Sequence, residues 1–85
     1  MEPVAGLIVR IFDTGWMELG HPDRPDRLLC DESGTAMWIA LCQTDWSVGD
    51  AAVHLARLWD ADPWWVRDMM QQWINDLLEA GIVEP

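Results

Sequence analysis

The sequence predicts an α+β fold in which three short antiparallel strands precede three helices. Residues 7–30 hold three short apolar-rich segments separated by a turn and an irregular loop. Residues 31–83 instead hold apolar positions at helical spacing between capping residues. The last two helices follow each other through a tight turn, which gives a winged helix-turn-helix-like outline. We expect residues 1–85 to form a single domain.

The strands come first. Residues 7–12 are rich in β-branched side chains and predict the first strand. Residues 13–15 end in a glycine that can take positive φ, so we expect a turn leading to a second strand over 16–19. Residues 20–26 contain two prolines and alternating charges, which favour an irregular loop. Residues 27–30 then predict the third strand.

Capping residues mark where the first two helices begin. Asp31, Glu32 and Ser33 precede residues 34–42, an almost wholly apolar segment that we expect to be a buried helix. Ser47 begins the second helix in a sequence that resembles a capping box. The inner face of this helix is expected to carry Val48, Ala52, Leu55 and either Leu58 or Trp59.

The third helix has the clearest boundaries. Asp62 is a suitable N-cap, Pro63 fits the first helical position, and Gly81 can end the helix with positive φ. Helical spacing predicts a core stripe of Val66, Met70, Trp73 and Leu77. Beside it lies a second apolar stripe of Trp65, Met69 and Gln72, which we interpret as a surface left for a partner. The opposite shoulder, formed by Arg67, Ile74 and Leu78, is the alternative.

Seven tryptophans are present in a short chain. We expect Trp38, Trp59 and Trp73 to fill the core. Trp64 and Trp65 are adjacent and would point about 100° apart on a helix, so both cannot be fully buried and one is expected to be exposed. Exposed tryptophan is enriched at protein interfaces.

The charge balance restricts the partners. The chain has fifteen aspartate and glutamate residues, five arginines and no lysine. Such a field repels nucleic acids and anionic membranes and suits a neutral or basic peptide. The sequence offers neither a membrane span nor a basic, apolar secretory signal. Cys30 and Cys42 are expected to be buried, reduced thiols, with a disulfide between them as the alternative, and the protein is expected to be cytoplasmic.

No constellation of catalytic side chains can be identified. The hydroxyl residues fall mostly at turns or caps, where a structural role explains them. Cys30 and Cys42 lack the spacing of a metal site, and neither a calcium loop nor a glycine-rich phosphate loop is present. We therefore expect a binding module rather than an enzyme, with no cofactor and no metal.

Residues 27–83 resemble a known family. Residues 29–38 read Leu-Cys-Asp-Glu-Ser-Gly-Thr-Ala-Met-Trp, which is similar to the Leu-x-(Asn/Asp)-x-(Thr/Ser)-Gly-x-x-(Ile/Met)-Trp element of PqqD-like proteins. The run from Asp62-Pro63 to Gly81-Ile82-Val83 is similar to their C-terminal helix. These domains are the RiPP recognition elements. In one departure from their pattern, the loop over residues 20–26 replaces a tight hairpin, which leaves the register of the third strand open.

The resemblance implies a small winged-helix-like domain that binds the leader of a ribosomally made precursor peptide. In this family the leader adds a strand to the third strand and lies beside the third helix. A free-standing acidic version resembles the recognition protein of lasso peptide biosynthesis, which delivers the leader to a separate cysteine-type leader peptidase. The expected peptide-binding residues are Arg27, Leu28, Leu29, Cys30, Asp31, Trp65, Met69, Gln72, Trp73 and Asp76.

Two further interpretations stay open from the sequence. An unpaired strand edge beside an apolar groove is also a surface through which the free protein could form a dimer. The fold outline also permits the runner-up, a winged-helix transcriptional regulator that binds DNA. Against this, residues 60–79 contain five carboxylates and one arginine, whereas a helix that enters a groove between phosphates should be neutral or basic.

Overall fold

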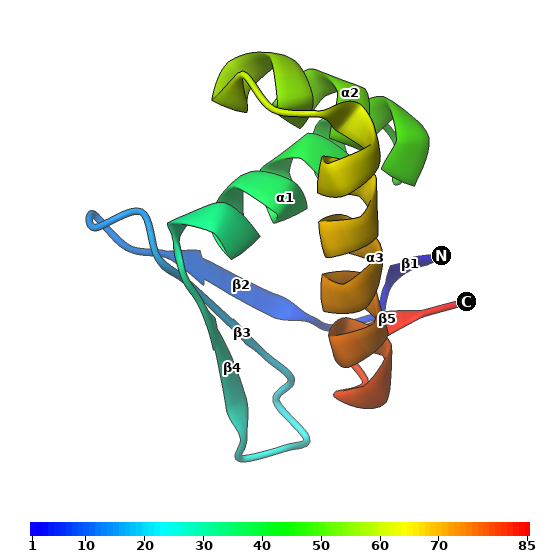
Figure 1. Ribbon diagram of the computed structural model, residues 1–85. Coiled ribbons are helices and arrows are strands. Elements are labelled where there is room, and N and C mark those ends of the chain that lie inside the picture. The colour runs from blue at the N-terminus through cyan, green and yellow to red at the C-terminus, as the bar shows by residue number, and fades with distance from the viewer.

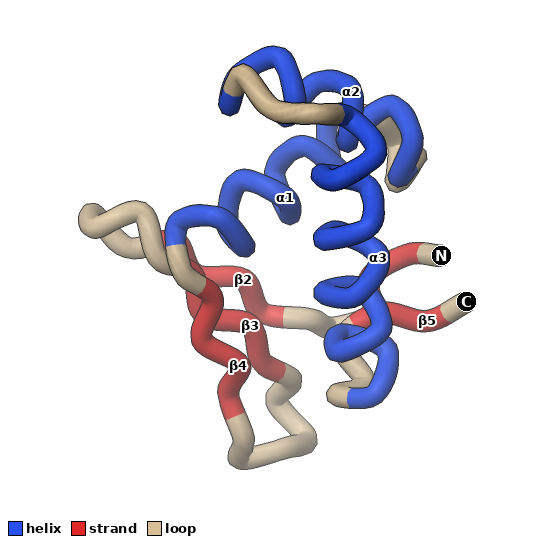
Figure 2. Tube along the Cα trace, in the orientation of Figure 1, coloured by secondary structure: helices blue, strands red, loops and turns tan.

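The computed structural model, which describes residues 1–85, confirms the predicted order of three strands and three helices (Figure 1). The strands form one antiparallel sheet and the helices gather on one side of it, as the colouring of Figure 2 makes clear. The elements are β2 (Ile8–Ile11), β3 (Met17–Gly20), β4 (Arg27–Cys30), α1 (Glu32–Gln43), α2 (Val48–Trp59) and α3 (Pro63–Glu79). None of the helices has the length and apolar character needed to cross a membrane.

A second, two-stranded sheet was not predicted. Strand β1 (Glu2–Pro3) pairs antiparallel with β5 (Val83–Glu84), which brings the two ends of the chain together (Figure 1). The Val4 amide extends this pairing by donating to the Ile82 carbonyl at 3.1 Å. The pairing joins segments at opposite ends of the sequence, so no local pattern announces it.

The three-stranded sheet has the order β2-β3-β4, so β2 and β4 are its edges. In β4, Cys30 lies opposite Met17 of β3, and Leu28 lies opposite Leu19. This register resolves the question left by the irregular loop over residues 20–26. Cys30, Met17 and Leu19 are buried, so this face of the sheet turns toward the helices.

The predicted capping residues start the helices, although α1 begins at Glu32 and ends at Gln43, slightly outside the predicted 34–42. The carboxylate of Asp31 accepts a hydrogen bond from the Gly34 amide at 2.9 Å, and that of Asp62 accepts one from the Trp64 amide at 2.8 Å. The Ser47 hydroxyl accepts one from the Asp50 amide at 3.3 Å. After α3 the chain turns at Gly81, whose φ of +74° is readily adopted only by glycine.

Two apolar clusters form the core. The first holds the three helices together, and the second packs the sheet against α1, α3 and the last residues of the chain. Trp38 is buried in the second cluster, as predicted, where its ring meets that of Trp46 edge to face with centroids 5.0 Å apart. Stability is therefore shared between helix packing and sheet packing.

Several predictions about burial are wrong. The core position on α3 is taken by Ile74, whereas Trp73 is only half-buried. Positions 73 and 74 both lie near the stripe that Val66, Met70 and Leu77 define, and the residue that enters the helical cluster is Ile74. Trp59 is likewise half-buried at the rim of the helical core.

The remaining differences concern exposed residues. Trp64 and Trp65 are both exposed, at 72% and 58%, instead of only one of them. Of the two alternatives for the inner face of α2, Leu58 is exposed, whereas Trp59 packs against the helical core. Cys30 is buried as predicted, but Cys42 is exposed near the end of α1; both thiols are free.

Candidate functional site

A groove runs between the free edge of β4 and α3 and is bounded at one end by the start of α1. It encloses about 600 Å³ and is mostly apolar in its lining. Figure 1 shows the backbone of β4 and α3, the two elements that contribute most of its lining. The lining residues are Trp16, Leu28, Leu29, Cys30, Asp31, Ser33, Gly34, Met37, Met69, Gln72, Trp73, Asp76 and Leu77.

One wall of the groove is a strand edge. β4 pairs with β3 on one side only, so the backbone groups that face away from β3 have no strand partner. Leu29 is 58% exposed on this edge. An extended peptide laid along β4 could therefore pair with its main chain while its side chains reach the groove.

The opposite wall is one shoulder of α3. Met69, Gln72, Trp73 and Asp76 recur at spacings of three and four residues, so they share one face of the helix and all line the groove. This is the shoulder that the sequence favoured. Of the alternative shoulder, Ile74 is 1% exposed within the helical core, and Arg67 lies against Trp64.

Trp73, Cys30 and Gly34 meet at the base of the groove. A side chain at Gly34 would place its Cβ 3.0 Å from the Cys30 Cβ and 3.4 Å from the Trp73 Nε1, so glycine lets α1 approach both walls. Burial raises the pKa of the Cys30 thiol; hydrogen bonding by the Trp73 indole opposes the rise and the nearby Asp31 carboxylate adds to it. The thiol thus stays protonated at neutral pH, which makes it part of an apolar wall rather than a nucleophile.

The charged side chains that line the groove are both acidic. Asp31 and Asp76 are its only ionisable lining residues besides the Cys30 thiol, and neither takes part in a salt bridge. No group of three or more metal-ligating side chains occurs in the structure. The groove therefore offers apolar surface, an unpaired strand edge and negative charge, which suit an extended neutral or basic segment.

Two residues of the predicted peptide site lie outside the groove lining. Arg27 lies across the backbone of Gly20, with its Nε 3.9 Å from a Glu18 carboxylate oxygen. Trp65 is exposed one helical turn before Met69 on the same stripe. The other predicted residues all line the groove: Leu28, Leu29, Cys30, Asp31, Met69, Gln72, Trp73 and Asp76.

Sequence reasoning missed five lining residues: Trp16, Ser33, Gly34, Met37 and Leu77. The sequence pattern assigned Leu77 and Met37 to the core and Ser33 and Gly34 to the start of a helix. Because a structural role already explained these four residues, the pattern gave no reason to expect them in the groove. Trp16 had no such signal, because only the tertiary fold brings the β2–β3 turn to the end of β4.

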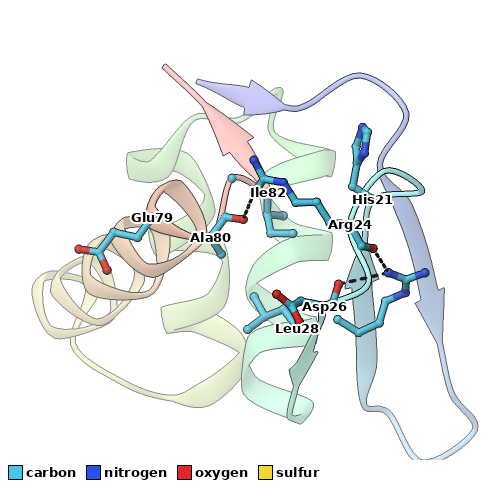
Figure 3. Close-up of a pocket in the computed structure, with 9 residues that line it drawn as sticks. His21, Arg24, Asp26, Leu28, Glu79, Ala80 and Ile82 are labelled. Atoms are coloured by element: carbon cyan, nitrogen blue, oxygen red, sulfur yellow. Dashed lines mark hydrogen bonds between the residues drawn. The ribbon is translucent and has the colours of Figure 1, made fainter.

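A second hollow of about 350 Å³ lies between the β3–β4 loop and the end of α3 (Figure 3). Arg24 donates from Nη1 to the Ala80 carbonyl at 3.2 Å, which satisfies one of the free carbonyls at the end of α3. Arg27 donates from Nη1 to the carbonyls of Arg24 and Asp26 at 2.8 and 3.1 Å. Arg24 ties the loop to the end of α3 and Arg27 braces the loop from β4, so we assign this hollow a structural role.

The fold can be compared with known proteins. No family model matches the chain, and no curated protein sequence matches it. A solved structure described as TbiB1 in complex with the TbiA(beta) leader peptide is similar in fold, with a TM-score of 0.86 over 99% of this chain and 95% of that one. The sequences are 14% identical, so the likeness establishes the fold. This chain has the α+β fold of a protein that was solved with a leader peptide bound, which is the fold that the resemblance implied.

Proposed function

We propose that this protein binds the leader region of a ribosomally synthesised precursor peptide, of the lasso peptide type, and presents it to a separate cysteine-type leader peptidase. The leader would add a strand to β4 and place alternate side chains in the groove beside α3. The observation that carries the proposal is the unpaired edge of β4 beside an apolar groove of about 600 Å³. The fold shared with a leader-peptide complex supports it.

Backbone pairing and side-chain pockets would have separate tasks in this proposal. Hydrogen bonds to the β4 main chain provide affinity that is independent of the peptide sequence, and the pockets provide the specificity. Met69 and Trp73 offer an adaptable apolar surface, since methionine is flexible and polarizable and tryptophan is large. An aromatic side chain of the leader would match that surface.

The protein would act without catalysis of its own. The groove holds no histidine or lysine that could activate the protonated Cys30 thiol, and the Asp31 carboxylate raises its pKa rather than lowering it. Cleavage of the leader would then fall to the separate peptidase, and this domain would hold the leader in an extended conformation for it.

The test is fluorescence anisotropy with a labelled synthetic peptide that carries the leader sequence from the short open reading frame adjacent to this gene. Labelled duplex DNA serves as the competing probe, because α3 stands where a winged-helix regulator places its recognition helix. We expect saturable leader binding and no DNA binding. DNA binding without leader binding would overturn the proposal.

Strand addition can be tested separately from side-chain recognition. Methylating single backbone nitrogens of the leader removes a donor and leaves the side chain unchanged. If the leader pairs with β4, methylation should weaken binding at alternate positions and have little effect between them, because every second amide points toward the partner strand.

Self-association through the same strand edge is tested by sedimentation velocity of the free and the leader-bound protein. A dimer that dissociates when the leader binds would indicate that free copies pair through this edge.

A further inference from the structure

Trp16 is a large aromatic side chain that the core does not use. It follows the turn between β2 and β3, is 40% exposed, and belongs to neither apolar cluster. Its indole instead lines the end of the groove where β4 gives way to α1. A tryptophan that remains accessible on a wall of a concave site is available to a ligand.

Trp16, just after the β2–β3 turn, and residues 31–33, at the start of α1, form a shallow, open hollow of about 250 Å³ lined by Trp16, Asp31, Glu32 and Ser33. The Glu32 side chain lies on the turn itself: a Cβ at Gly15 would come within 3.2 Å of the Glu32 Cγ, and Gly15 has a φ of +89°. Glycine at the turn therefore keeps Glu32 beside Trp16. The hollow opens into the groove, since Trp16, Asp31 and Ser33 line both.

The two carboxylates of this hollow have no cation within the protein. Neither Asp31 nor Glu32 takes part in a salt bridge, and no arginine or histidine lines the hollow. One oxygen of Asp31 caps α1 through the Gly34 amide, which leaves its second oxygen available. The helix N-terminus contributes only about half a positive charge, so two carboxylates leave the hollow negative.

An aromatic face beside two carboxylates and a hydroxyl matches the chemistry of an ammonium or guanidinium group. The ring attracts a cation through its quadrupole, and the carboxylates accept charge-assisted hydrogen bonds from it. We propose that the Trp16–Asp31–Glu32 hollow binds a lysine or arginine side chain of the leader peptide. This inference rests on the proposed function of the groove and names the kind of leader that fits it.

The geometry also predicts which position of the leader sequence carries the basic residue. A strand paired with β4 advances about 3.3 Å per residue, so the basic residue belongs at, or within about three residues beyond, the leader position that faces Asp31. This contact would define the alignment of the leader. Backbone pairing alone tolerates slippage, and a slip of one residue turns every side chain to the other face. A fixed cation at one end of the groove selects one register.

The test is a set of double-mutant cycles with the labelled leader peptide described above. Each lysine or arginine of the leader is replaced singly by methionine, and binding is measured to the unmodified protein and to Glu32→Gln. One replacement should weaken binding to the unmodified protein by about tenfold and by less than about twofold to Glu32→Gln. Glu79→Gln is the matched control, because it removes a carboxylate at the C-terminal end of α3, outside both the hollow and the groove lining. It should preserve the full tenfold effect.

The aromatic contribution needs its own pair of variants. Trp16→Leu should reduce the effect of the same leader replacement, and Trp16→Phe should restore part of it, since phenylalanine keeps a cation-binding face. Circular dichroism verifies that both variants fold; if Trp16→Leu does not fold, the comparison of Trp16→Phe with the unmodified protein decides.

The two proposals can fail independently. Leader binding in which no basic residue couples to Glu32, or a leader without lysine or arginine in the stated window, would overturn the cation site and leave the groove intact. Absence of leader binding by the unmodified protein would overturn both.

Discussion

The two edges of the sheet, β2 and β4, offer the same unpaired main chain but very different surroundings. All four residues of β2 are exposed; Ile8, Val9 and Ile11 are exposed by 49%, 42% and 51%. No residue of β2 lines the groove. At the other edge, β4 has Leu28 and Cys30 turned toward α3, with Met69 and Trp73 facing them across the groove.

This difference indicates what a strand edge needs, besides free hydrogen-bonding groups, to select among peptides. Both edges have free hydrogen-bonding groups, which any extended chain can satisfy. Only β4 has a helix alongside that supplies pockets for the side chains of an added strand. The proposed function therefore depends on the pair β4 and α3, and the exposed β2 edge serves as an internal comparison.

The largest effect is expected from Met69→Glu, which places a carboxylate on the α3 wall. Leader binding would bury this charge without a partner, which costs about 3 kcal/mol, so we expect the Kd to rise roughly 100-fold. Val9→Glu on the β2 edge is the matched control, and it should change the Kd by less than about twofold. Anisotropy with the labelled leader measures both. An equal loss of affinity in the two variants would show that the groove does not distinguish the edges.

A smaller effect is expected from Trp65→Ala. Trp65 lies on the same stripe of α3 as Met69 but one turn beyond the groove lining, so it can touch only a leader that extends past the groove. We expect the Kd to rise by no more than about threefold, which is typical of a contact at the rim of an interface. Trp64→Ala, on the face of α3 that carries Arg67, is the control and should have no effect. A loss of tenfold or more in Trp65→Ala would extend the site by one helical turn.

The smallest effect is expected on the rates at which a reagent modifies the two thiols. This measurement tests whether the leader covers β4 without introducing any substitution. Cys30 is 5% exposed at the base of the groove, and Cys42 is exposed on α1. Burial raises the pKa of both thiols, and Cys30 lies deeper. At neutral pH a thiol reagent should therefore modify Cys42 first, and saturating leader should slow only the reaction of Cys30. Mass spectrometry identifies the modified residue, and slowing at Cys42 instead would argue against leader binding in the groove.

Local signals made most of the fold predictable. The starts of the three helices could be predicted from Asp31, Ser47 and Asp62, because N-capping depends only on the capping residue and its next few neighbours. Gly81 announces the end of α3 for the same reason. The β1–β5 pair escaped prediction because it joins opposite ends of the chain, and a two-residue strand carries almost no pattern of its own.

The site was predictable where one element carried its signal. The stripe of Met69 and Gln72 on α3 follows from helical spacing alone. Helical spacing assigned Trp73 to the core because it cannot distinguish this position from Ile74, whereas the family resemblance included Trp73 in the peptide site, and Trp73 lines the groove. Trp16 was missed because the irregular loop over residues 20–26 left the register of the third strand open, and it is the observed Met17–Cys30 pairing that sets Trp16 beside Asp31.

Amide hydrogen exchange measured by NMR, with and without the leader peptide, tests the central claim most directly. The claim is that the leader pairs with the β4 edge. We expect saturating leader to slow exchange at the β4 amides that face away from β3, and to leave exchange along the β2 edge unchanged. Slowed exchange on β2, or leader binding without any change at β4, would contradict the account.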